Sequence, residues 1–112
     1  MSPKRNPLGL NALQLKTLTL LQELARLPTY SRPAEGAGVV VRTPDPHGDH
    51  FHLGDAIVAT RDASGLRNPA VWVALERKGL IHSMYPNGAV VTPLGLEYET
   101  GLREVIFHKS GH

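Results

Sequence analysis

Hydrophobic and polar positions follow a helical spacing near the start of this chain. Between residues 10 and 27 the leucines recur every three or four positions, which places them on one broad helix face. Residues 11–14, Asn-Ala-Leu-Gln, resemble a capping box, in which the Gln side chain reaches back to the cap amide. Pro28 cannot continue a helix. The pattern therefore predicts an N-terminal helix over residues 11–27.

The middle of the chain changes to short apolar runs. Residues 39–42 and 50–53 flank a segment dense in Pro, Asp and Gly, so they predict two paired strands that form an extra β-hairpin. Residues 54–61 then predict a helix, and residues 62–65 predict a turn. In this order, the helix and the turn would form the first half of a helix-turn-helix.

The strongest local signals begin at residue 68. Asn68 is a favourable N-cap, and Pro69 suits the first helical position because its missing N–H needs no partner there. Gly79 is free to adopt the left-handed conformation that ends a helix. These signals predict a helix over residues 69–78.

A second hairpin and a last helix follow. Residues 85–88, Tyr-Pro-Asn-Gly, form a turn sequence between two apolar runs, which predicts a hairpin over residues 80–92. Thr and Pro at positions 92 and 93 repeat the combination of cap and proline. They begin a predicted C-terminal helix over residues 93–107, which Gly101 weakens by about 1 kcal/mol relative to alanine.

Two segments of this region resemble a known protein family. Residues 75–81, Leu-Glu-Arg-Lys-Gly-Leu-Ile, and residues 91–95, Val-Thr-Pro-Leu-Gly, resemble the pattern of bacterial winged-helix regulators of the MarR and PadR kind. In those families a recognition helix ends in Gly-Leu-Ile before a wing, and the next helix starts with Leu-Thr-x-x-Gly. Val91 takes the place of that leucine here. The resemblance implies an α+β winged helix-turn-helix with a three-helix core, a wing hairpin and a C-terminal helix.

Length and composition agree with one small domain. The chain has 112 residues, of which 41% are hydrophobic, and it contains no cysteine, which excludes disulfides and thiol chemistry. No apolar run approaches the roughly 18 residues of a membrane helix, and the start lacks the apolar stretch of a secretory signal. We expect a single domain over residues 1–112, with a flexible basic arm at 1–10, that is cytoplasmic and has no membrane partner.

Charge adds a modest argument for nucleic acid. The formal net charge is only +2, but residues 1–22 carry three basic residues and no acidic one. The resemblance implies that the helix at 69–78 enters the major groove of duplex DNA with its N-terminal end. Arg67 and Asn68 occupy that end, where arginine suits guanine and asparagine suits adenine.

Other candidates for DNA contact lie around this helix. Phosphate contacts position a protein without carrying sequence information, and they need basic or hydrogen-bonding side chains. The candidates of this kind are Lys4, Arg5, Arg61, Arg77, Tyr85 and Asn87. Trp72, at the flank of the helix, is a further candidate for DNA contact. The predicted function is therefore a transcriptional regulator that binds DNA through the helix at 69–78 and the wing at 80–92. A simpler explanation remains open, in which the arginines are solvated surface charges and Asn68 is only a cap.

An alternative function follows from two apolar residues of the same helix. Val73 is expected on the outward face and Trp72 at its flank, beside the residues proposed to contact DNA. Exposed tryptophan more often marks a protein contact. The alternative is therefore a winged-helix adaptor that binds another protein through Trp72 and Val73 and does not bind DNA.

The histidines around residue 50 form the one pattern that suits a metal. His50 and His52 would share one face of a strand, and His47 and Asp49 lie in the preceding turn, which is a donor set for Zn or Ni. Exposed histidines on a hairpin are commonly structural, so we predict no metal and no cofactor. No phosphate loop or catalytic motif occurs, and we predict that the protein is not an enzyme.

Leucine content suggests self-association. The first helix carries more leucine than a small domain is expected to bury, and the last helix adds further apolar residues. The leucines are Leu10, Leu13, Leu15, Leu18, Leu20, Leu21, Leu24 and Leu27, and the C-terminal residues are Leu94, Leu102, Val105, Ile106 and Phe107. We expect a homodimer through the first and last helices, which would address two half-sites about 34 Å apart.

Overall fold

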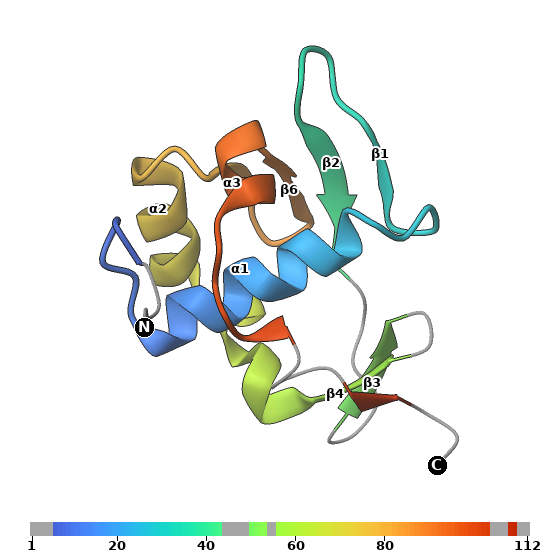
Figure 1. The fold of residues 1–112 in the computed structure, drawn as a ribbon. Helices are drawn as coiled ribbons and strands as arrows, with labels where there is room; N and C mark the ends of the chain where they lie inside the picture. Colours follow the sequence, from blue (N-terminus) through green and yellow to red (C-terminus); the bar gives the residue numbers. More distant parts are fainter. Residues whose placement is uncertain (1–5, 44–49, 54–55, 104–107, 110–112) are drawn as a thin grey trace.

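The protein is an α+β domain in which one long helix lies along the centre of the molecule (Figure 1). The computed structural model describes residues 6–43, 50–53, 56–103 and 108–109. The elements are α1 (Ala12–Leu24), β1 (Ser31–Pro33), β2 (Val39–Arg42), β3 (His50–Leu53), β4 (Ala56–Ala59), the 3-10 helix η1 (Thr60–Arg67), α2 (Pro69–Arg77), β5 (Ile81–Met84), β6 (Gly88–Val91), α3 (Pro93–Glu97) and β7 (His108–Lys109).

Helix α1 begins where its capping signal predicts. The Asn11 side chain accepts from the Gln14 amide at 2.8 Å, and the Gln14 side chain accepts from the Asn11 amide at 2.9 Å. The helix ends at Leu24, three positions before the predicted end at residue 27. The chain takes a tighter, 3-10-type turn there, because the amide of Leu27 donates to the carbonyl of Leu24, three residues earlier, and not to a carbonyl four residues earlier.

The strands form two antiparallel sheets, and this corrects the predicted pairing of 39–42 with 50–53. One sheet has the order β1-β2-β6-β5 and the other has the order β3-β4-β7. Strand β2 pairs with β6, which is distant in sequence, so that Val41 faces the core beside Ala89. Local turn signals identify a reversal of the chain, but they carry no information on such long-range partners.

The predicted first helix of the helix-turn-helix is also wrong. Residues 56–59, Ala-Ile-Val-Ala, form strand β4, and residues 60–67 form the 3-10 helix η1, which contains the predicted turn at 62–65. A short apolar run with β-branched residues favours a strand, and periodicity alone cannot separate it from a helix. Residues 54–55 lie outside the described residues.

The segment from residue 68 to the start of α3 matches its prediction closely. The Asn68 side chain accepts from the Ala70 amide at 3.0 Å and caps α2, and Gly79 takes a φ of 78° where the helix has ended. Strands β5 and β6 form the predicted hairpin around the turn at 85–87. Thr92 caps α3 through a bond from the Gly95 amide at 3.1 Å.

The last predicted helix is much shorter than expected. Helix α3 ends at Glu97, because Tyr98 takes an extended conformation with φ −63° and ψ 129°. Gly101 then adopts a φ of 73°, which is incompatible with a continuous helix. Residues 104–107, which include three of the apolar residues assigned to a dimer contact, lie outside the described residues.

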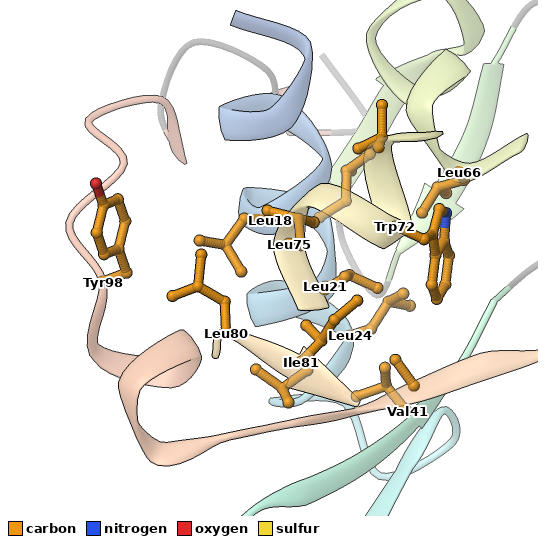
Figure 2. Close-up of a cluster of buried hydrophobic side chains, with 14 of the residues drawn as sticks. Leu18, Leu21, Leu24, Val41, Leu66, Trp72, Leu75, Leu80, Ile81 and Tyr98 are labelled. Carbon is orange, nitrogen blue, oxygen red and sulfur yellow. The ribbon is translucent and has the colours of Figure 1, made fainter. Parts of the chain in front are cut away.

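The core is built around α1, and this removes the argument from excess leucine. Figure 2 shows α1 leucines packed against side chains from α2, β2 and β5. Leu18, Leu20, Leu21 and Leu24 are each 0% exposed within a single chain. Their burial requires no second copy, so the premise for a dimer through α1 is wrong, while the dimer itself stays a prediction. None of the described helices is long and apolar enough to cross a membrane.

The segment before α1 is fastened to the C-terminal part of the chain. The sequence assigns residues 6–10 to a flexible arm, but the Tyr98 hydroxyl donates to the Asn6 side chain at 2.6 Å and accepts from the Leu8 amide at 3.1 Å. Leu10 is 4% exposed. Residues 1–5 lie outside the described residues, and with them Lys4 and Arg5.

This attachment gives a first testable prediction. Tyr98→Phe removes two hydrogen bonds and should lower the free energy of unfolding by about 1–2 kcal/mol. Amide hydrogen exchange should accelerate over residues 6–10. Tyr85→Phe is a matched control, since the Tyr85 hydroxyl has no hydrogen-bond partner among the described residues. Equal effects of the two substitutions on exchange would contradict the attachment.

Candidate functional site

The surface of α2 has the arrangement that the helical pattern predicts, with one exception. Val71 and Leu75 are buried, and the side chains that face out are mixed in chemistry. The exposed residues are Pro69, Ala70, Val73, Glu76 and Arg77. The exception is Trp72, which is 0% exposed.

Trp72 is a core residue, which corrects its assignment to DNA or protein contact. Its Nε1 donates to the Gly65 carbonyl at 3.1 Å. Its ring meets Tyr85 edge-on, with 5.4 Å between centroids and 71° between planes. The helical pattern placed Trp72 at the flank, because it could not show that η1 and the β5–β6 turn cover that side of α2. An adaptor surface that uses Trp72 is therefore excluded in the folded chain.

The two residues predicted to contact bases differ in availability. Arg67 is exposed at the end of η1, directly before α2. Asn68 is partly buried, and its Oδ1 accepts the capping bond from Ala70. Bidentate recognition of adenine needs both the oxygen and the nitrogen of an asparagine side chain. As long as Asn68 caps α2, Arg67 is the more available of the two residues for contact with a base.

The C-terminal part of α2 carries opposite charges. Arg77 is exposed, whereas Glu76 Oε2 accepts from the backbone amide of Ser83 at 3.2 Å. This bond ties α2 to β5 and holds one carboxylate on the face between helix and hairpin. The positive charge of this surface therefore lies toward its two ends, at Arg67 and Arg77.

The turn of the predicted wing is closely held. Tyr85 is half-buried against Trp72, and Asn87 is exposed while its carbonyl accepts from the Thr43 amide at 3.1 Å. Met84 is 46% exposed. The turn itself has no Lys or Arg, but Arg42 lies opposite Gly88 in the sheet register. A basic residue beside this turn thus comes from β2, which the sequence pattern did not indicate.

The remaining predicted residues lie on η1, on β3 and in the segment before β3. Arg61 lies within η1, and His50 and His52 lie within β3, whose pairing with β4 is described. His47 lies outside the described residues. In the part of the chain that was searched, no three His, Asp or Glu side chains gather to hold a metal.

A pocket that the sequence analysis missed lies on the β1–β2 hairpin. It is open, has a volume of about 270 Å³, and contains two arginines. Its lining residues are Thr29, Tyr30, Ser31, Arg32, Val40 and Arg42. No sequence signal indicated it, because Arg32 and Arg42 come together only through the pairing of β1 with β2.

Comparisons with protein-family models, with curated proteins and with solved structures find no match to this chain. The function must therefore be argued from the geometry of the chain itself.

Proposed function

We propose that this protein is a winged-helix DNA-binding protein that acts as a transcriptional regulator, with α2 as the helix that enters the major groove. The observation that carries the proposal is the order of elements. Helix α1, strand β2, the helical turns of η1, helix α2 and the β5–β6 hairpin come in this order along the chain, with β1, β3 and β4 inserted between them, and β2 lies next to β6 in the sheet. In a winged helix the same order presents the second helix of the pair to DNA.

The charges and caps of α2 support this proposal. Arg67 stands exposed at the N-terminal end of α2, the end that approaches base edges. Arg77 stands exposed at the other end, within the range of phosphates expected along a groove. Pro69, Val73, Glu76 and Arg77 are exposed, so the outward face of α2 is accessible in the described part of the chain.

Binding of duplex DNA tests the proposal directly. The full chain, titrated into labelled random duplex at low salt, should bind with an affinity that falls by about 0.9 log units per phosphate contact for each log unit of salt. Arg77→Gln should reduce that slope by about one contact, and Arg67→Gln should also weaken binding to the random duplex.

Arg103→Gln is the matched control for these variants. It removes the same charge at a site where Arg103 pairs with Glu23 at 3.0 Å, away from α2. Binding should stay within twofold of the unmodified protein. Absence of DNA binding at low salt, or an equal loss in all three variants, would refute the proposed function.

A protein contact is the second candidate, in a form that no longer uses Trp72. Val73 is 47% exposed on α2 and Met84 is 46% exposed on β5. Val73 directly follows Trp72, and Met84 directly precedes Tyr85, whose ring contacts that of Trp72. An apolar contact at this place would be insensitive to salt, which distinguishes it from DNA binding. Sedimentation equilibrium of the free chain tests whether a second copy is the partner.

A further inference from the structure

The β1–β2 hairpin places two arginines on one face. Arg32 pairs with Val40 across the hairpin, and Arg42 follows Val40 by two positions. Because side chains alternate along a strand, Arg32, Val40 and Arg42 share a face. Val41 points to the opposite face, where it is 1% exposed in the core. The face with the arginines therefore points away from the core.

These side chains line the open pocket of about 270 Å³, together with Thr29, Tyr30 and Ser31. Among the described residues, its lining includes no acidic side chain. The Ser31 hydroxyl is already used, since it donates to the Leu27 carbonyl at 2.9 Å. The ligand-binding capacity of the pocket thus resides mainly in the two guanidinium groups.

Arg42 is held in position before any ligand binds. Its Nη2 donates to the Thr29 carbonyl at 3.0 Å, and its guanidinium carbon lies 4.9 Å from the centroid of the Tyr30 ring. A guanidinium has five N–H donors, so several remain for a ligand. Because the Arg42 side chain is already held in place, it loses less conformational entropy when a ligand binds.

Arg32 supplies the second positive charge without a partner of its own. It is exposed, and within the described residues neither Arg32 nor Arg42 forms an ion pair with a carboxylate. Two like charges on one face repel each other, and an anion between them would remove that repulsion while accepting hydrogen bonds from both.

We propose that this pocket binds a phosphate group, held between Arg32 and Arg42. A phosphate offers several oxygens in different directions, which suits two forked guanidinium groups better than a single carboxylate does. Tyr30 and Val40 would contact the organic part attached to the phosphate. Two sources supply this chemistry, a free phosphate monoester and a phosphodiester of nucleic acid. The pocket does not rest on the proposed role of α2.

Titration with inorganic phosphate tests the proposal. In amide and arginine side-chain NMR spectra of the full chain at low chloride, phosphate should shift signals of residues 29–32 and 40–42. Arg32→Gln should weaken phosphate binding by roughly tenfold, and Arg42→Gln by at least as much. Arg42→Lys should fall between, since it keeps the charge and loses the fork.

Arg26→Gln is the matched control, since it removes an exposed charge that does not line the pocket. It should leave the phosphate affinity within twofold. Arg32→Gln should fold normally, because the Arg32 side chain makes no hydrogen bond or ion pair among the described residues. A loss of phosphate binding in this variant would therefore not result from misfolding. No shift in the hairpin, or the same loss in Arg26→Gln as in Arg32→Gln, would overturn the proposal.

Competition identifies the source of the phosphate. Duplex DNA that displaces inorganic phosphate from the hairpin signals would assign the pocket to a backbone phosphodiester. A nucleoside monophosphate that displaces phosphate when duplex DNA does not would assign it to a free phosphate monoester. Either result supports a phosphate site, and neither result requires that α2 binds DNA.

Discussion

Replacing Trp72 with alanine should lower the free energy of unfolding by about 3–5 kcal/mol, the range typical of removing a buried aromatic side chain. The indole is 0% exposed, and it lies among side chains from α1 and η1 (Figure 2). Its removal leaves a cavity, frees the Gly65 carbonyl and exposes the half-buried ring of Tyr85. Urea unfolding followed by circular dichroism measures the change.

Trp72→Phe separates packing from hydrogen bonding. It keeps a ring in the core and loses the bond from Nε1 to Gly65, so the cost should be about 1–3 kcal/mol. Val73→Ala is the matched control on the next residue of α2. Since Val73 is 47% exposed, its truncation should change stability by less than about 0.5 kcal/mol. Similar effects of Trp72→Ala and Val73→Ala would contradict the burial described here.

These paired substitutions also separate stability from function. If an adaptor function exists, Val73→Ala should reduce binding of the partner without affecting folding. A loss of function in Trp72→Ala would instead follow the loss of folded protein. The sequence analysis treated both residues as one surface, and the structure divides them because helix α2 buries one and exposes the other.

The features that the sequence predicts correctly are those that depend on neighbouring residues. The caps at Asn68 and Thr92 and the left-handed Gly79 act within a few residues, and the structure confirms all three. The pairing of β2 with β6 joins residues far apart in the chain, and Trp72 is covered by η1 and Tyr85, which lie outside its own helix. No periodicity in one segment can report such contacts.

The candidate sites follow the same rule. Arg67 was predictable because it directly precedes a capped helix. The pocket between Arg32 and Arg42 was not predictable, because it exists only when β1 and β2 pair in one register. A shift by one residue would turn one of the two arginines to the other face of the sheet.

The second large effect is expected at Gly95, the glycine of the motif on which the family resemblance rests. Gly95→Ala should lower the free energy of unfolding by about 3 kcal/mol, at the upper end of overpacking effects. A Cβ at this position would collide with the backbone carbonyl oxygen of Leu80, and it would lie 3.0 Å from Cγ1 of Val91.

The Leu80 carbonyl cannot easily move away. It accepts from the Thr92 amide at 3.0 Å and from the Thr92 hydroxyl at 3.1 Å, so a shift would weaken the cap of α3 as well. The Gly95 carbonyl is also engaged, since it accepts from Gln22 of α1 at 2.8 Å. Glycine at this position is therefore required by the close approach of α3 to the chain that enters β5.

Gly95→Ala should destabilise the protein, and this is the opposite of the effect expected in an exposed helix. In an exposed helix, replacing glycine with alanine stabilises the protein by about 1 kcal/mol. Leu94→Ala, at an adjacent position that is 50% exposed, is the control and should change stability by less than about 0.5 kcal/mol. Urea unfolding compares the two variants, and amide shifts of Thr92 and Leu96 report on the cap. If Gly95→Ala were neutral or stabilising, α3 would not lie against Leu80, and the glycine of the motif would need another explanation.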